Sequence, residues 1–190
     1  DLEQKETFAD MQIGSIIGLL LIYIILAWVF KSWTRPFSIM IMIPFAFIGA
    51  VLGHYLLGLT MSILSMFALL ALAGIVVNNS IILVSTIERR FDDLLSQNDK
   101  DRQDDKVINE AIIAGVVDRF RPVLLTSLTT IGGLSALLFE KSLQAQFLIP
   151  MAATIVFGLG ITAFLVLVIV PSMMGISNDF SNFVKIIRRR

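Results

Sequence analysis

The run from Met61 to Ile87 contains no Asp, Glu, Lys or Arg. A run of that length can cross the ~30 Å hydrocarbon core of a bilayer. Two adjacent carboxamides, Asn78 and Asn79, lie inside it, within the segment 74–84. Polar groups at that depth are costly and usually face another helix or a water-filled cavity. The run therefore predicts a membrane helix with a polar face that needs a partner.

The composition excludes several classes of protein. A hydrophobic content of 56% and a mean hydropathy of +0.85 are not those of a soluble globular domain. The 15 basic residues balance the 15 acidic ones, so no nucleic-acid partner is predicted. The chain has no cysteine, and its single histidine, His54, cannot build a metal site alone. No nucleophile–base pair lies in the apolar runs, so we expect neither an enzyme nor a cofactor.

Five apolar runs predict an all-α fold: a polytopic membrane bundle of five transmembrane helices and one cytoplasmic amphipathic helix. The five helices are expected at about 11–30, 37–57, 61–87, 122–139 and 146–170. The amphipathic helix is expected at 106–120, against the membrane surface, with Ile108, Ile112 and Val116 on one stripe. A flexible loop is expected at 96–105.

Prolines and a short linker predict how these helices begin, bend and end. Pro44 is expected to kink the second helix, Pro122 to begin the fourth and Pro171 to end the fifth. The linker 58–60 is too short for anything but an antiparallel pair of helices.

Glycines at helical spacing predict faces where helices approach closely. The candidate packing residues are Gly14, Gly18, Gly49, Gly53, Gly74, Gly133 and Gly158. Thr126, Thr129 and Thr130 add hydroxyls to one such face. The bland interpretation, a purely structural role, is that each hydroxyl donates a hydrogen bond to a carbonyl one turn earlier in its own helix. The bland interpretation of Asn78 and Asn79 is interhelical hydrogen bonding. His54 is expected at the membrane interface without a partner.

The basic residues predict the orientation. If the helices alternate in direction, all basic residues except Lys5 and Lys141 fall on one side, which the positive-inside rule makes cytoplasmic. The expected segments are a periplasmic lead-in (1–10), three helices (11–87), a cytoplasmic loop with the amphipathic helix (88–121), two helices (122–171) and a cytoplasmic basic tail (172–190). The first residue is Asp rather than Met, and no signal peptide precedes the first helix, so we expect a part of a longer protein.

Three stretches, taken together, resemble the C-terminal membrane half of resistance–nodulation–cell division (RND) efflux transporters. They are Lys31-Ser32-Trp33-Thr34-Arg35-Pro36-Phe37 continuing through Pro44 and Gly49 to Gly58; the segment 74–84; and Arg119-Phe120-Arg121-Pro122-Val123-Leu124-Leu125-Thr126-Ser127-Leu128 continuing to Gln144-Ala145-Gln146-Phe147. They span nearly the whole chain in matching order and spacing.

The resemblance implies a proton-driven exporter of the bacterial inner membrane. Such pumps have twelve helices in two repeated halves, usually form homotrimers, and can engage a periplasmic adaptor and an outer-membrane channel. This chain would supply the last five helices, embedded in membrane lipid beside the remaining half of the transporter. The other half would carry two intramembrane Asp at the positions equivalent to Asn78 and Asn79.

The resemblance also assigns the site. Many family members have Lys where this chain has Asn78, and the family's relay threonine maps onto Thr126. Asn78, Asn79 and Thr126 are therefore candidate residues lining the proton relay. The alternative is a non-transporting membrane scaffold or a lipid-sensing module with the same bundle.

Overall fold

The computed structural model describes the backbone of residues 2–98 and 105–188, and side chains of residues 6–96 and 106–177. Within these ranges every regular element is a helix: α1 (Leu2–Phe30), α2 (Thr34–Met40), α3 (Met42–Leu57), α4 (Ile63–Asn98), α5 (Asp105–Leu138), α6 (Leu143–Gln146) and α7 (Ile149–Arg188). The predicted all-α class is confirmed for these residues. The predicted loop at 96–105 is wrong at 96–98 and 105, which belong to α4 and α5, and its residues 99–104 lie outside the described residues.

Four helical stretches in the described chain are long and apolar enough to cross a membrane. They are Glu6–Phe30, Thr34–Leu57, Ile63–Ser96 and Ile149–Ser177. Helix α5 is not among them, so the structure supports a membrane bundle without confirming the fifth span.

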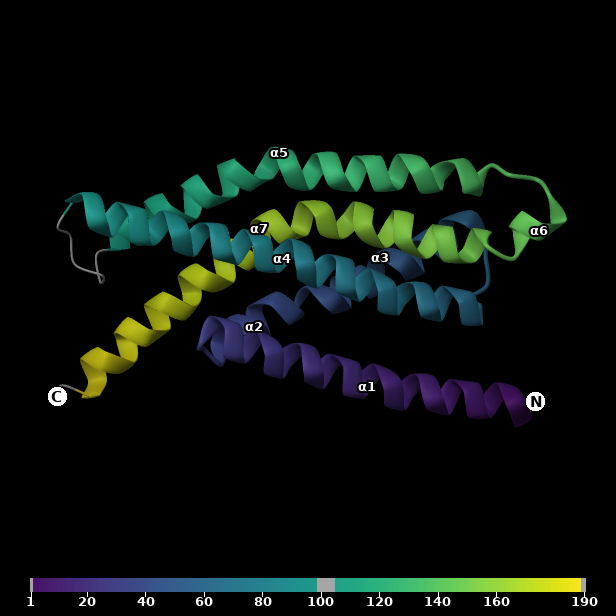
Figure 1. Ribbon diagram of the computed structural model, residues 1–190, viewed down its shortest axis with the longest axis horizontal. Coiled ribbons are helices and arrows are strands. Elements are labelled where there is room, and N and C mark those ends of the chain that lie inside the picture. Colours follow the sequence, from purple (N-terminus) through teal and green to yellow (C-terminus); the bar gives the residue numbers. More distant parts are fainter. Residues whose placement is uncertain (1, 99–104, 189–190) are drawn as a thin grey trace.

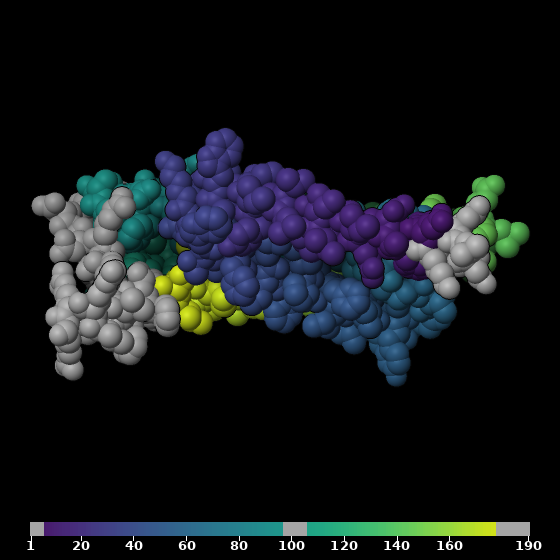
Figure 2. Space-filling model, turned by 90° about the horizontal axis from the view of Figure 1, so that it is seen from below, coloured from purple at the N-terminus to yellow at the C-terminus, as the bar shows by residue number. Residues whose placement is uncertain are grey.

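The long helices run up and down along one axis of the molecule (Figure 1). Helix α7 is the shared partner, because it packs against α3, α4 and α5. Helix α1 contacts mainly α2 and lies across one side of the bundle (Figure 2). The end of α4, the start of α5, α2 and the end of α7 lie at one end of the bundle, and α6 and the start of α1 lie at the other. The predicted alternation in direction is therefore seen.

The core lies where α7 meets α3 and α4. Leu72, Val76 and Leu83 of α4 and Leu159 and Val166 of α7 are almost fully buried. By contrast, only 11% of the most apolar stretch of α1 is buried, against 56% of the corresponding stretch of α7. The apolar surface of α1 is left for lipid or for another segment.

Glycines set the closest approach in the bundle, between α3 and α7. A Cβ added at Gly49 would lie 2.9 Å from the Cα of Gly158 and 2.9 Å from the carbonyl oxygen of Phe157. A Cβ added at Gly53 would lie 2.4 Å from the Phe157 ring. The two backbones therefore touch at Gly49, and only a residue without a side chain fits there.

The other candidate packing glycines divide into two groups. A Cβ at Gly158 would meet Leu72 at 2.2 Å and the carbonyl oxygen of Ala46 at 3.1 Å. Open space surrounds the remaining four within the described chain: Gly14, Gly18, Gly74 and Gly133. Those four contribute no helix–helix contact here.

The predicted kink at Pro44 is a one-residue break. Helix α2 ends at Met40 and α3 begins at Met42, with Ile41 between them. Pro44 has no N–H for the Met40 carbonyl, and its ring would clash with that carbonyl in a continuous helix. The break is therefore placed one turn before the proline.

The turn between α3 and α4 confirms the predicted antiparallel pair. Gly58 adopts φ 63°, a left-handed conformation that favours glycine. The N–H of Leu59 donates to the His54 carbonyl at 2.9 Å, and that of Gly58 to the Tyr55 carbonyl at 3.3 Å. This pair of bonds is a Schellman motif, which satisfies the last carbonyls of α3.

Two predicted helix ends are wrong. Pro122 lies inside α5 and Pro171 inside α7, so the amphipathic segment and the fourth predicted helix form one continuous helix, and the fifth continues to Arg188. Each proline is held by packing beside it, since Val123 and Val170 are buried. Such prolines are tolerated in membrane helices where neighbours restore the lost bonds.

The N-terminal part of α5 packs on α4 through a stripe one residue away from the predicted one. Val107 and Ala111 are buried, whereas Ile108, Ile112 and Val116 are only half-buried. A Cβ at Gly115 would lie 2.5 Å from Cγ1 of Ile87 and 2.9 Å from its Cα. The small residues Ala111 and Gly115 therefore lie where α5 packs against α4.

We expect Gly49→Ala to lower the free energy of unfolding by about 1–2 kcal/mol. Overpacking costs about 1–3 kcal/mol, and the helix-forming gain of Ala over Gly, about 0.5–1 kcal/mol, offsets only part of it. Thermal denaturation of the purified chain in detergent measures the change. Gly14→Ala is the control, because nothing lies within 4 Å of its new Cβ; equal stability of the two variants would contradict the close contact.

Candidate functional site

The polar stripe of α4 faces away from the bundle. Ala71, Gly74, Asn78 and Ser85 are all exposed, in agreement with their shared helical face. Asn79 lies about 100° further round and is half-buried. The opposite side of α4 carries the buried core residues, so the stripe is the side that α7 leaves uncovered.

Neither amide makes a hydrogen bond with any residue of the described chain. The neighbouring Ser80 behaves differently, because it is buried and donates to the Val76 carbonyl at 2.8 Å. The interhelical hydrogen bonds of the bland interpretation are therefore not made inside this part of the chain. The amide groups of Asn78 and Asn79 are available to something outside it.

The threonines of α5 bond to their own helix. Thr126 donates to the Pro122 carbonyl at 2.9 Å, Thr129 to the Leu125 carbonyl at 3.0 Å, and Thr130 to the Thr126 carbonyl at 2.9 Å. The bland interpretation thus describes all three hydroxyls. Thr126 and Thr129 are nevertheless exposed, with oxygen lone pairs left to accept a bond.

The structure does not join the three candidate relay residues directly. No hydrogen bond links Asn78, Asn79 or Thr126 to one another among the described side chains. They lie on α4 and α5, two helices that pack together. Each therefore presents its polar group from one of two adjacent helices.

His54 has hydrogen-bond partners, so the expectation that it lacks one is wrong. Its side chain is buried, with Nδ1 at 2.9 Å from the Ala50 carbonyl oxygen and Nε2 at 3.0 Å from Oγ of Ser65. Because a carbonyl can only accept, Nδ1 carries the proton and Nε2 accepts from the Ser65 hydroxyl. His54 thereby ties the end of α3 to the start of α4.

A capping motif in the sequence could have indicated this partner. The N–H of Ser65 donates to the Ser62 hydroxyl at 3.2 Å, and that of Ser62 to the Ser65 hydroxyl at 3.3 Å. The reciprocal bonds form a capping box at the start of α4. A serine three residues after a serine, eleven residues after His54, was the available signal.

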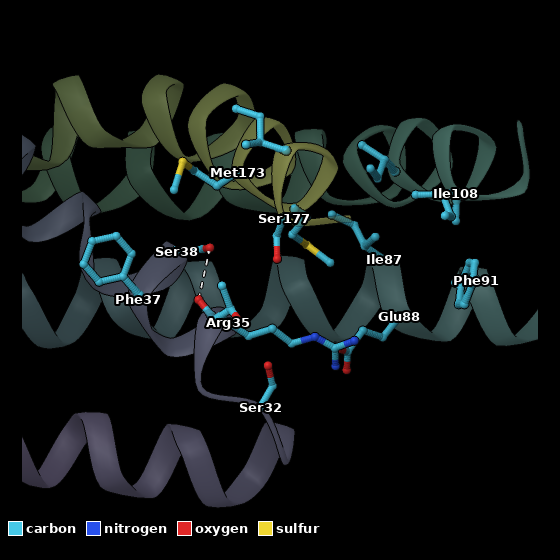
Figure 3. Close-up of a pocket in the computed structure, with 15 residues that line it drawn as sticks. Ser32, Arg35, Phe37, Ser38, Ile87, Glu88, Phe91, Ile108, Met173 and Ser177 are labelled. Carbon is cyan, nitrogen blue, oxygen red and sulfur yellow. Dashed lines mark hydrogen bonds and ion pairs between the residues drawn. The ribbon is translucent and has the colours of Figure 1, made fainter. Parts of the chain in front are cut away.

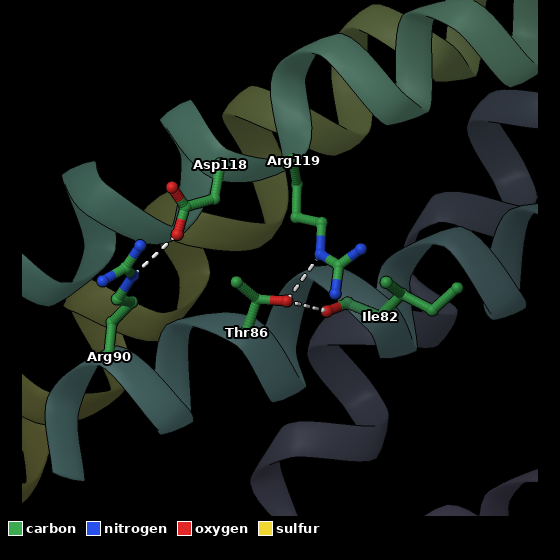
Figure 4. A network of polar contacts seen from close by, with 5 residues as sticks. All are labelled: Ile82, Thr86, Arg90, Asp118 and Arg119. Carbon is green, nitrogen blue, oxygen red and sulfur yellow. Dashed lines mark hydrogen bonds and ion pairs between the residues drawn. The ribbon is translucent and has the colours of Figure 1, made fainter. Parts of the chain in front are cut away.

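Two polar contacts join α4 to the N-terminal half of α5 (Figure 4). Nε of Arg119 donates to Oγ1 of Thr86 at 2.6 Å, and that hydroxyl donates on to the Ile82 carbonyl at 2.8 Å. Nε of Arg90 lies 2.6 Å from Oδ2 of Asp118, forming an ion pair. The hydrogen bond from Arg90 and its charge hold the pKa of Asp118 below its ordinary value.

Metal-ligating side chains do not gather anywhere in the described residues. No group of three or more His, Cys, Asp or Glu side chains there is placed to hold a metal ion. The polar groups that the structure exposes are amides and hydroxyls.

Comparison with known proteins assigns the family. The family model of the AcrB/AcrD/AcrF transporters matches residues 2–176. The chain belongs to this family of RND transporters.

Relatives in this family cover most of the chain. Swarming motility protein SwrC of Bacillus subtilis is 32% identical over 167 residues, which are 87% of this chain and 15% of SwrC. Multidrug resistance protein MdtC of Erwinia amylovora is 31% identical over 79% of this chain and 14% of MdtC. Nickel and cobalt resistance protein CnrA of Cupriavidus metallidurans is 28% identical over 73% of this chain and 12% of CnrA.

Solved structures agree with the family. The crystal structure of a heavy metal efflux pump matches with a TM-score of 0.77 and 26% identity, over 92% of this chain and 16% of the pump. The chain thus spans about 15% of the length of the relatives that it matches.

We expect the α4–α5 contact at Arg90 and Asp118 to weaken in acid. Because the pKa of Asp118 is depressed in the folded state, the contact is fully present above the ordinary Asp value and is lost as the pH falls through the folded value. Spin labels at Leu94→Cys and Ala114→Cys measure the spacing, in a sequence without native cysteine. At pH 7, Asp118→Asn should broaden the distance distribution, and the two proteins should converge as the pH falls below the ordinary Asp value and through the depressed pKa of Asp118; identical distributions at pH 7 would contradict the role of the pair.

Proposed function

We propose that this chain forms part of the membrane domain of a proton-driven RND efflux transporter, and that Asn78, Asn79 and Thr126 line its proton relay. The observation that carries the proposal is the uncovered polar stripe of α4, where Asn78 is exposed and has no hydrogen-bond partner in the described chain. A carboxamide on the outside of a membrane helix is costly unless another segment or water meets it.

The role proposed for the amides follows from their chemistry. A neutral amide cannot carry a proton, but it can donate two hydrogen bonds and accept others. Asn78 and Asn79 would orient a carboxylate or a water supplied by the other half of the transporter. Thr126, with its hydroxyl proton bonded within α5, would accept a hydrogen bond from the same chain of groups.

We also propose the five-span arrangement, with residues 122–138 of α5 as the fourth span. The stretch contains no charged residue, and α5 lies alongside α7. The basic residues of 31–35, 88–96 and 106–121 lie at the same end of the bundle, which the positive-inside rule places in the cytoplasm. Residues 1–10 and Lys141 would then face the periplasm, and 172–190 would be a cytoplasmic tail.

The transporter function is favoured over a non-transporting scaffold or lipid-sensing module, because the family match covers nearly the whole chain. The assembly as a homotrimer with a periplasmic adaptor and an outer-membrane channel, and the absence of enzymatic activity, belong to the same proposal. The names of relatives refer both to multidrug resistance and to nickel and cobalt resistance, so no substrate class is proposed.

In the full transporter, we expect Asn78→Leu to reduce proton-coupled export roughly tenfold, because leaving a buried partner unsatisfied costs about 1–3 kcal/mol. Transport assayed in proteoliposomes under a pH gradient measures the loss. Asn109→Leu is the control, since Asn109 is an exposed amide outside the apolar stretch of α5. Undiminished export by Asn78→Leu would remove Asn78 from the relay.

We expect Thr126→Ala to lower export with normal folding, whereas Thr129→Ala and Thr130→Ala should have little effect. All three variants lose the same kind of bond to a helix carbonyl. A difference between them therefore reports the contact that Thr126 makes beyond its own helix. Equal effects from the three substitutions would reduce Thr126 to a structural residue.

A further inference from the structure

A cavity of about 790 Å³ opens at the end of the bundle where α2 and the start of α5 lie. It lies between α2, α4, α5 and the C-terminal part of α7, which diverges from α4 there (Figures 1 and 3). Its volume falls in the range of about 300–1,000 Å³ that small-molecule sites occupy. The candidate relay residues are not among those that line it.

One side of the cavity is charged. Arg35 of α2 and Glu88 of α4 form an ion pair there, with hydroxyl groups of Ser32 and Ser177 nearby (Figure 3). The side chains of Arg35 and Glu88 are 42% and 27% exposed, so the pair is not sealed off. A guanidinium has five N–H donors and a carboxylate has two oxygens, so both groups keep capacity for a further ligand.

Apart from Thr34 and Ser38, the other residues that line the cavity are apolar. Ile87, Phe91, Ile108 and the two methionines Met173 and Met174 line it. Methionine side chains are flexible and polarizable, and they adapt to irregular apolar ligands. A ligand that fills the whole cavity must therefore combine a polar end with an apolar tail.

The position of the cavity narrows the choice to a membrane lipid. The cavity lies where the part of α4 without charged residues ends. Two exposed aromatic residues, Trp33 and Phe37, lie at the same end of the bundle. Aromatic residues gather at the level of the lipid head groups. Neighbouring opposite charges match a head group that itself carries both signs, whereas a purely anionic head group would meet repulsion from Glu88.

We propose that this cavity binds one phospholipid with a phosphoethanolamine head group, the phosphate on Arg35, the ammonium on Glu88, and an acyl chain between α5 and α7. Arginine is well suited to phosphate, since its planar fork bonds two oxygens at once. The lipid would then contact α2, α4, α5 and α7 at once, since residues of all four helices line the cavity.

The full-length transporter tests this proposal. The protein is equilibrated in nanodiscs of equimolar phosphatidylethanolamine and phosphatidylglycerol, extracted in mild detergent, and its retained lipid is quantified by mass spectrometry. The wild type should retain phosphatidylethanolamine in preference. Glu88→Gln should abolish the preference, and Arg35→Gln should lower retention of phosphatidylethanolamine about tenfold, the effect of losing hydrogen bonds to a charged group.

Two further variants separate binding from general damage. Ala111→Phe should expel the lipid by filling the cavity, since Ala111 is one of its lining residues. Arg89→Gln should change nothing, because Arg89 is an exposed neighbour that does not line the cavity. Glu88→Gln keeps the size of the side chain, so it reports charge even if the bulky variant fails to fold.

Retention that is the same in the wild type, Glu88→Gln and Arg35→Gln would overturn the proposal. Equal retention of the two lipids by the wild type, lost only in Arg35→Gln, would also overturn it, because a phosphate site alone does not need Glu88. Lipid retention is read without any transport assay, so its outcome is independent of the role proposed for Asn78 and Thr126.

Discussion

The contact of the α3 and α7 backbones at Gly49 is the constraint on which the rest of the bundle depends. In a bilayer, lipid tails are as apolar as the side chains, so helices associate through close packing rather than through burial from water. Helix α7 also packs against α4 and α5, so its position relative to α3 fixes both. Since α7 takes the side of α4 with Leu72 and Val76, the side with Asn78 must face outward. The outward direction of the polar stripe thus follows from the close contact of α3 and α7 at Gly49.

Local rules predicted those parts of the fold that local chemistry decides. The antiparallel pair joined by the short linker 58–60 and the bend at Pro44 were both predicted in this way. Pro122 and Pro171 obey the same rule as Pro44 but lie inside helices. Val123 beside Pro122 and Val170 beside Pro171 are buried in helix–helix contacts, which a single sequence does not reveal. Proline therefore predicts a weakened position, and tertiary contacts decide whether the helix ends there.

The sequence predicted the candidate site to a similar extent as the fold. Helical spacing placed Asn78 on the same face as Gly74, and the structure exposes both. Helical spacing alone did not reveal that His54 is bonded to Ser65, because the contact depends on how α3 turns back onto α4; the capping motif at the start of α4 was the signal for it. The hydrophobic pattern likewise predicted that the isoleucines of α5 form its packing stripe. In the structure, Gly115 makes the close contact with α4. Small residues allow that approach but add nothing to a hydrophobic pattern.

The arginines of α2, the end of α4 and the start of α5 have two roles, which a count of basic residues does not separate. Arg90 is paired with Asp118, Arg35 with Glu88, and Arg119 donates to Thr86. These three arginines hold α2, α4 and α5 in place, and the acidic partners cancel part of their charge. Exposed basic residues such as Arg89 and Arg121 form no ion pair in the described chain. Their charge is the part left to interact with anionic lipid and to set the orientation. The same cluster of residues therefore shapes the bundle end and its relation to the membrane.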